Sequence, residues 1–388
     1  MFKFKNISRQ VFVLGLISFF TDFASEMLYP IVPLFLTVTL GASMAVVGVI
    51  EGIAAVTSGL LKGYFGLLSD KLGKQSIFVK IGYGLSGIVK SLPGFFPFIS
   101  SVIFYRTVDR IGKGIRTAPR DVLLSVEAKE QNSGAVFGFH RGMDTLGAVV
   151  GPLIALLILY FLPGNYRIIF LVAIIPSLSA IYLTFKVKDL AGTKKSVHKK
   201  HYKAFWKLAP PAYKRLLMII AVFSLANSSD VFLILKSKAA SGSDSTAILG
   251  YVFYNFIYAV LSYPVGLLSD KLGKKNIFTF GIFIFSIVYF GFASNPSFII
   301  IWFLFALYGL YSAATEGVSK AWISDLIKPE FKGTAMGLFN LVTSIALMFG
   351  SLLAGLLWDL FGSQIPFFLS AVVSLIMVPV FIFNRKNY

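Results

Sequence analysis

The chain has 388 residues, of which 56% are hydrophobic and only 14% are charged, and its formal net charge is +19. A soluble protein carries about 25% charged residues, so this chain has too few to cover water-soluble domains of its length. The composition therefore predicts an integral membrane protein. The absence of cysteine excludes disulfides, thiolate metal sites and cysteine nucleophiles, and we expect neither a metal nor a cofactor.

Twelve apolar stretches are long enough to cross a membrane as helices, which takes roughly 20 residues each. In the first half of the chain they fall at about 11–38, 44–66, 77–95, 98–119, 134–162 and 167–185. In the second half they fall at about 214–237, 246–267, 276–294, 298–326, 333–359 and 366–384. Their continuity favours helices over the short alternating strands of a membrane barrel.

The first span carries two carboxylates, Asp22 and Glu26, one helical turn apart on one face. Ionisable residues at membrane depth usually face a cavity or a partner, and two adjacent carboxylates resist joint ionisation. We therefore predict that this pair carries a proton, and the alternative is an ion pair that only fixes helix packing. Asp230 in the second half matches Glu26 and is the equivalent candidate there. Glu51 and Glu316, which also lie within the spans, are weaker candidates of the same type.

The loop after the second span, which reads GLLSDKLGK, is predicted to be a conformational latch. Gly66 and Gly73 permit a close helix approach and a tight turn. Asp70 can accept hydrogen bonds, and we expect it to pair with Arg116 or Arg120 and to latch the outward-open state. A solvated turn that carries cytoplasmic lysines is the alternative. With the second copy of the loop included, the predicted latch residues are Gly66, Asp70, Gly73, Lys74, Arg116, Arg120, Asp270 and Gly273.

The fourth span is unusually rich in charge for a membrane helix. Its ionisable residues are Arg106, Asp109, Arg110, Lys113, Arg116 and Arg120. Arg110 lies at mid-span, where its charge can stabilise a nearby carboxylate and release it when the pairing changes, so we predict that it couples proton and substrate. Arg116 and Arg120 lie near the cytoplasmic end, where snorkelling or phosphate contact is the alternative.

The fifth span begins with His140 and Arg141, and Asp144 follows one helical turn after the histidine. A histidine with a carboxylate at this spacing predicts a proton relay, and a hydrogen-bonded structural histidine is the alternative. We therefore include these three residues in the predicted coupling site.

Most of the basic residues near the loops fall on one side of the predicted membrane. The stretch 186–215 alone contains ten lysines and arginines. The positive-inside rule places this stretch and both termini in the cytoplasm, so we expect a multi-pass protein of the inner, cytoplasmic membrane. This placement accounts for much of the positive charge without nucleic acid, and we expect the basic stretch to lie on anionic lipid.

The nine residues from Gly66 to Lys74 recur without change from Gly266 to Lys274. This repeat predicts two parallel halves in one chain. The predicted fold class is an all-α integral membrane protein with twelve transmembrane helices in two pseudo-symmetric six-helix bundles. The predicted domains are an N-terminal bundle at 1–185, a cytoplasmic basic linker at 186–213 and a C-terminal bundle at 214–388.

These motifs resemble those of the major facilitator superfamily. The GxLxDKxGK loop resembles the family signature, and RIGKGIRTA, which starts at Arg110, resembles its second motif, RxxxGxxxA. Gly147, Gly151 and Pro152 resemble the antiporter motif GxxxGP, without the glycine pair that usually follows. The resemblance covers the whole chain and implies the fold of the family, a coupling role for Arg110 and a place in the proton-coupled drug or metabolite efflux branch.

We therefore predict a secondary transporter that exports a small organic molecule by proton-coupled antiport and rocker-switch alternating access, driven by the proton gradient. It is expected to work as a monomer among membrane lipids. An importer, or a transporter of a siderophore, organic anion or lysolipid, is the alternative within the same fold. A membrane-embedded transferase is the alternative of another class, but the chain lacks HExxH, cysteine and a convincing Ser/His/Asp set, so we expect no enzyme activity.

Overall fold

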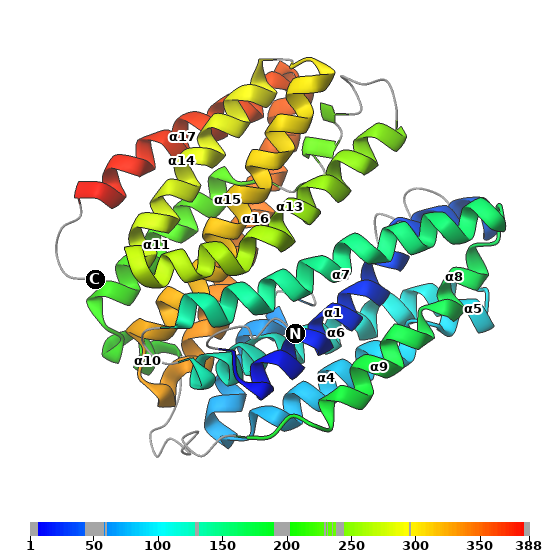
Figure 1. The fold of residues 1–388 in the computed structure, drawn as a ribbon, viewed down its shortest axis with the longest axis horizontal. Helices are drawn as coiled ribbons and strands as arrows, with labels where there is room; N and C mark the ends of the chain where they lie inside the picture. Colours follow the sequence, from blue (N-terminus) through cyan, green and yellow to red (C-terminus); the bar gives the residue numbers. More distant parts are fainter. Residues whose placement is uncertain are drawn as a thin grey trace. The chain divides into compact units, whose positions relative to one another are not determined.

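The computed structural model describes residues 7–42, 58, 60–128, 132–189, 202–228, 230, 232–234, 236–237, 244–294 and 296–383. Throughout these ranges the regular structure is helical and no strand occurs (Figure 1). The long apolar stretches read from the sequence are therefore helices wherever the structure describes them.

The chain divides into two compact units, and two segments are exchanged between its halves. Unit 1 comprises Met1–Glu127, Met143–Phe205 and Lys328–Asn340, and unit 2 comprises Ala128–Gly142, Trp206–Ile327 and Leu341–Tyr388. The exchange arises because α7 (Ser133–Phe161) begins in unit 2 and ends in unit 1, while α16 (Lys332–Phe361) does the reverse. The predicted division into two sequence halves, which stays a prediction, differs from these units by the two exchanged segments.

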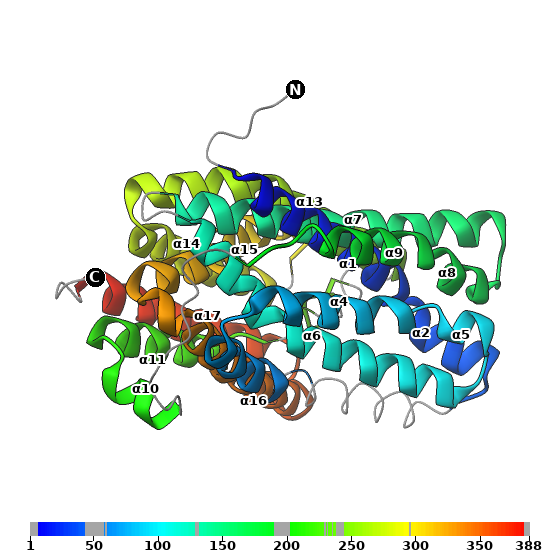
Figure 2. The same ribbon diagram turned by 90° about the horizontal axis from the view of Figure 1, so that it is seen from below.

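In unit 1 the helices run largely alongside one another. Besides part of α7, they are α1 (Arg9–Leu28), α2 (Ile31–Leu34), the π-helical η1 (Phe35–Thr39), α4 (Gln75–Val89), α5 (Leu92–Phe95), α6 (Ile99–Glu127), α8 (Tyr166–Val172) and α9 (Ile174–Thr184). Residues 60–72 are also helical. α4 packs against α6 and α9, and α9 packs against α1 (Figure 2).

In unit 2 the helix α15 packs against both α13 and α14, and α14 also packs against α17. The helices of this unit are α11 (Pro211–Ala226), α13 (Asp244–Leu272), α14 (Lys274–Ala293), α15 (Phe298–Leu326), α17 (Gln364–Phe383), most of α16 and the start of α7. The short helix α10 (Tyr202–Leu208) precedes α11, and the 3-10 turn η2 (Pro329–Phe331), which belongs to unit 1, precedes α16.

Eight helices in the described part of the chain are long and apolar enough to cross a membrane, or nine if α10 and α11 form one bent span. The predicted span at 44–66 falls largely outside the described residues. α4 has only 15 residues, and α6 has 29 residues but is too rich in charge to count as apolar. Twelve spans therefore remain a prediction, while a multi-pass helical membrane protein is confirmed.

The predicted first span, 11–38, is one helix only as far as Leu28. α1 ends there, and α2 begins at Ile31 after Pro30. Proline lacks a backbone N–H and clashes with the preceding turn, so it interrupts a continuous helix. The break was visible in the sequence as a proline inside an apolar stretch.

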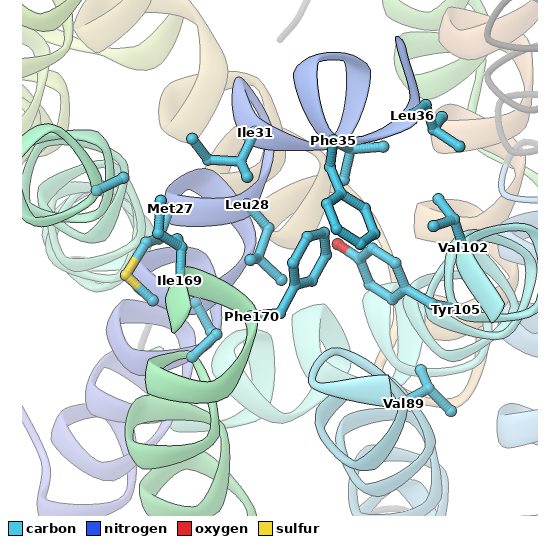
Figure 3. Close-up of a cluster of buried hydrophobic side chains, with 14 residues drawn as sticks. Met27, Leu28, Ile31, Phe35, Leu36, Val89, Val102, Tyr105, Ile169 and Phe170 are labelled. Carbon is cyan, nitrogen blue, oxygen red and sulfur yellow. The ribbon is translucent and has the colours of Figure 1, made fainter. Parts of the chain in front are cut away.

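A cluster of buried apolar side chains surrounds this break in unit 1 (Figure 3). The ring of Phe170 on α8 lies 5.0 Å from that of Phe35 and 6.3 Å from that of Tyr105, measured between centroids. Lipid tails are as apolar as these side chains, so close packing and not escape from water stabilises such contacts. The cluster holds α1, α6 and α8 together beside the charged residues described below.

Candidate functional site

The carboxylates of α1 have a partner on α7 that the sequence did not reveal. The carboxyl group of Asp22 interacts electrostatically with that of Asp144, and Glu26 also interacts with Asp22. Ser18 donates a hydrogen bond to Asp144. Two neighbouring carboxylates resist joint ionisation, because each negative charge disfavours the other. The Asp22–Asp144 pair is thus a group that can hold a proton inside the membrane.

Two glycines allow the close approach of α7 and α1 that makes this pair. A Cβ atom on Gly147 would lie 2.3 Å from the carbonyl oxygen of Phe19, and one on Gly151 would lie 2.6 Å from that of Phe23. Small residues at helix interfaces let backbones pack closely in membranes. The antiporter-like motif, which ends at Pro152 within α7, therefore lies directly against the helix that carries the carboxylates.

A buried lysine that sequence reasoning missed connects three helices of unit 1. The Lys90 side chain on α4 is 1% exposed, and its Nζ donates a hydrogen bond of 3.1 Å to the carbonyl oxygen of Thr21 on α1. The same Nζ lies 4.0 Å from Oδ1 of Asp109 on α6, which also accepts a hydrogen bond from Ser86. A lysine within an apolar stretch was the signal that could have identified it.

Arg110, the predicted coupling residue, lies within this charged region. Its Nε is 3.5 Å from Oδ2 of Asp109, and it interacts electrostatically with Glu26. Lys113 interacts with both Asp22 and Glu26. One group of opposite charges thus includes the carboxyl pair and the arginine named from the sequence.

Asp70 of the predicted latch accepts hydrogen bonds from the start of α16. Its Oδ1 is 2.9 Å from the backbone N of Gly333, and its Oδ2 is 2.6 Å from the N of Thr334 and 2.8 Å from Oγ1 of the same threonine. The first N–H groups of a helix have no partner within the helix and carry partial positive charge, which makes a carboxylate a good cap. The N-terminus of α16 is therefore the partner of Asp70 in this structure.

The arginines that we expected as partners of Asp70 are placed elsewhere, which corrects that prediction. The guanidinium of Arg116 lies over the Tyr83 ring, 4.3 Å from its centroid. Arg120 pairs with Asp121 at 2.9 Å. The expectation overlooked that a helix N-terminus can supply the positive partner without any basic side chain.

The second copy of the loop makes the reciprocal contact in unit 2. Oδ1 and Oδ2 of Asp270 each lie 2.8 Å from a backbone N at the start of α7, those of Gly134 and Ala135 respectively. Lys274 adds an ion pair of 3.0 Å to Asp270 and one of 2.8 Å to Asp325. Asp70 thus caps the start of α16 within unit 1, and Asp270 caps the start of α7 within unit 2.

Glycine is required where these helices meet. A Cβ on Gly66 would lie 2.6 Å from the carbonyl oxygen of Gly333, and a Cβ on Gly266 would lie 2.2 Å from that of Gly134. After each aspartate the chain turns through a glycine with positive φ, 64° at the first copy and 90° at the second. These are Gly73 and Gly273 of the predicted latch. Lys74, the last residue of the first loop, is the N-cap of α4.

A second group of polar side chains lies in unit 2 around Asp230. The hydroxyl of Tyr308 donates a hydrogen bond of 2.7 Å to Oδ1 of Asp230. The ring of Tyr308 lies 4.8 Å from that of Tyr254 and 5.2 Å from that of Tyr311, centroid to centroid. Tyr308 and Tyr311 lie on α15 and Tyr254 lies on α13, and no local sequence pattern shows that these two helices are neighbours.

Arg141 belongs to unit 2, where it pairs with Glu316. Its Nη2 lies 3.0 Å from Oε2 of Glu316, and its Nε donates a hydrogen bond of 2.5 Å to the hydroxyl of Tyr258. His140 is buried and also belongs to unit 2, whereas Asp144 belongs to unit 1. The predicted relay between these two residues stays a prediction.

Two further predictions concern Glu51 and the absence of a metal or cofactor. Glu51 lies outside the described residues. Over the described ranges, no group of three or more His, Cys, Asp or Glu side chains could hold a metal ion. The absence of a metal or cofactor from the working protein therefore stays a prediction.

Comparison with known proteins identifies the family of this chain. The family model described as Major Facilitator Superfamily matches residues 14–237 and 217–387. An uncharacterised MFS-type transporter of Methanocaldococcus jannaschii is 36% identical over 382 residues, which cover 96% of this chain and 94% of that one. Two solved structures share the fold. The human organic anion transporter MFSD10 has a TM-score of 0.79 at 14% identity and covers 98% of this chain and 100% of that one. An E. coli fucose:proton symporter has a TM-score of 0.77 at 11% identity, with 97% and 98% covered. With its reciprocal helix caps and matches along almost its whole length, the chain belongs to the major facilitator superfamily of transporters.

Proposed function

We propose that this transporter exports a small organic molecule in exchange for protons, and that its two units alternate access to the substrate between the two sides of the membrane. The protein is a multi-pass membrane transporter of its family. Export, proton coupling and antiport are the parts proposed here, as is the inner membrane with both termini in the cytoplasm. Because one chain contains both repeats, we propose a working monomer that needs neither cofactor nor nucleic acid.

The neighbouring carboxyl groups of Asp22 and Asp144 are the observation that supports proton coupling. Such a pair favours holding one proton, and loss of that proton places two negative charges side by side. Lys113 lies within electrostatic range of both carboxylates of α1, so a cation is available when the proton leaves. Arg110 interacts with both Glu26 and Asp109, which supports its predicted coupling role.

The direction of transport is supported by the glycine motif of α7. Gly147 and Gly151 lie against α1, next to the carboxyl pair, so the antiporter-like motif and the proton site share one helix interface. Protonation of Asp22 or Asp144 would change the charge at this interface, and a close-packed interface responds by shifting between discrete arrangements.

The test is a proton-flux measurement in proteoliposomes that enclose a pH-sensitive dye. Cationic drugs, organic anions and siderophores are added in turn, and a substrate of the antiporter should move protons across the membrane. We expect Asp22→Asn, Glu26→Gln and Asp144→Asn to abolish this flux while the protein stays folded.

Asp189→Asn is the matched control, because this carboxylate binds the backbone N and the hydroxyl of Ser76 and lies outside the charged group. It should retain the flux. Wild-type pH dependence in the Asp22→Asn/Asp144→Asn variant would contradict proton coupling through this pair. An absence of proton movement with every compound would favour a uniporter and assign the carboxylates a structural role.

A second candidate function is transport of an organic anion, which the geometry of Arg141 favours. Its Nη2 lies 3.0 Å from Oε2 of Glu316, and both side chains are partly exposed. Arginine binds carboxylates best through two parallel hydrogen bonds, so a substrate carboxylate could displace Glu316. The name of MFSD10 refers to an organic anion transporter, but at 14% identity that likeness carries the fold alone. Loss of anion flux in Arg141→Gln, with cation flux unchanged, would distinguish the two candidates.

A further inference from the structure

The short helix α10, which lies within the basic stretch 186–215, has one buried face and one exposed face. Phe205 is 3% exposed, whereas Trp206 is 39% and Leu208 is 62% exposed. Lys203 and Lys207 also lie on the exposed face. α10 therefore presents lysine, tryptophan and leucine side chains together, and α11 continues from it at an angle of 118° (Figure 1).

The buried face of α10 contacts both sides of the Asp70 latch within unit 1. The hydroxyl of Tyr202 donates a hydrogen bond to the carbonyl oxygen of Gly63, which lies one helical turn before Gly66. The ring of Phe205 lies 5.8 Å from that of Phe331, two residues before the capped N–H of Gly333. α10 thus bridges the helix that carries Asp70 and the segment that leads into α16.

The hydrogen bond from Tyr202 is a stable part of this arrangement. Burial and the nearby charge of Asp70 raise the pKa of the Tyr202 hydroxyl above its ordinary value. The hydroxyl therefore keeps the proton that it donates to Gly63 throughout the physiological range.

The exposed face of α10 has the composition of a helix that lies at a membrane surface. Tryptophan is favoured at the boundary between headgroups and acyl chains, and lysines lay their apolar stems there while their charges reach anionic headgroups. The ammonium group of Lys214 lies 5.7 Å from the centre of the Trp206 ring, which adds a third positive charge beside this face. Three cations next to exposed apolar side chains match an anionic lipid surface in both charge and chemistry.

We propose that α10 binds anionic lipid headgroups, and that lipid bound there holds the Asp70 latch closed. Attraction between the lysines and the headgroups keeps α10 at the surface, where Tyr202 and Phe205 press on the two segments that Asp70 joins. The Asp270 latch of unit 2 is reinforced differently, by the ion pairs of Lys274. Lipid should therefore act on one latch and not on the other.

Hydrogen exchange measured by mass spectrometry tests this proposal without a known substrate. The full chain is placed in nanodiscs of phosphatidylcholine, with or without roughly 30 mol% phosphatidylglycerol, a fraction that gives a strongly negative surface. We expect phosphatidylglycerol to slow amide exchange at residues 332–337 by roughly fivefold. Exchange at residues 133–138, which Asp270 caps, should stay unchanged and serves as the internal reference.

Two sets of variants separate α10 from surface charge in general. Lys203→Gln/Lys207→Gln should abolish the lipid effect. Lys186→Gln/Lys188→Gln removes the same charge from two exposed lysines elsewhere in unit 1 and should retain the effect. Tyr202→Phe should weaken the effect on exchange while phosphatidylglycerol still co-purifies with the protein, because it breaks the contact with the latch and leaves the lipid-binding face intact.

Each outcome decides the proposal. The proposal is overturned if phosphatidylglycerol does not slow exchange at residues 332–337 of the wild type, or if it slows exchange at residues 133–138 equally. It is also overturned if the effect disappears in Lys186→Gln/Lys188→Gln, or if the effect is unchanged in Lys203→Gln/Lys207→Gln. None of these results bears on proton coupling, which is tested separately by flux.

Discussion

The carboxylate of Asp70 lies 2.6 Å from the backbone N of Thr334, although 264 positions of the chain separate the two residues. This contact joins the helix of residues 60–72 to the first turn of α16 within unit 1. Asp270 makes the equivalent contact with α7. The repeated loop is therefore a pair of helix caps, each of which attaches an exchanged helix to the unit in which that helix begins.

The two caps should be separable by mutation. Asp70→Asn keeps the shape of the side chain but removes its charge and one acceptor oxygen, which weakens its bonds to the N–H groups of α16. We expect amide exchange at residues 332–337 to rise roughly tenfold, which corresponds to the typical energy of a helix cap. Asp270→Asn should raise exchange at residues 133–138 instead. Equal effects of either variant on both segments would contradict independent caps.

Replacing a glycine at a close helix contact with alanine should destabilise the protein. In Gly66→Ala the added methyl would lie 2.6 Å from the carbonyl oxygen of Gly333 and 2.8 Å from Cα of Gly337, both backbone atoms that cannot rotate away. We expect a loss of about 1–3 kcal/mol in the free energy of unfolding, typical of overpacking. Gly84→Ala is the control, because nothing lies within 4 Å of its added Cβ and alanine favours a helix. Denaturant titration of the purified protein would measure both, and an equal loss in the two variants would contradict the close approach.

The sequence predicted the position of the latch but not its partner. The identical copies of GLLSDKLGK indicated that Asp70 and Asp270 are equivalent, and Gly66 and Gly266 predicted a close helix contact. The partner is a set of backbone N–H groups, and residue types do not reveal which backbone N–H group binds a given side chain. The natural guess was therefore a basic side chain, and Arg116 and Arg120 proved to be placed elsewhere.

The contacts of the charged residues in unit 1 could also be predicted only in part from the sequence. Asp22 and Glu26 could be paired from the sequence because helical spacing brings i and i+4 together. The interaction of Asp22 with Asp144 depends on which helices are neighbours, which no local pattern encodes. Lys90 could have been found by its burial cost alone, since a lysine in an apolar span needs a partner.

The bond between Tyr308 and Asp230 should contribute measurably to stability. Tyr308→Phe removes the donor and leaves the carboxylate with one hydrogen bond fewer in a part-buried site. We expect a loss of about 1.5–3 kcal/mol in the free energy of unfolding, as for hydrogen bonds to charged groups. Tyr254→Phe is matched in size and burial, and its hydroxyl bonds the neutral Ser312 at 3.3 Å. It should cost about 1 kcal/mol. Equal losses in a denaturant titration would mean that the charge of Asp230 contributes nothing.

The ion pair of Lys90 and Asp109 should show strong coupling between its members. Lys90→Met removes the cation beside Asp109 and the bond to Thr21, so a buried carboxylate loses a positive partner. Breaking a buried pair on one side typically costs about 3–5 kcal/mol. Asp109 then keeps its contact with Arg110, 3.5 Å away. Asp109→Asn in the Lys90→Met background removes this less compensated charge, and we expect it to restore at least half of that loss. A double-mutant cycle of unfolding free energies measures the coupling, and strictly additive losses would show that Lys90 is held by Thr21 alone.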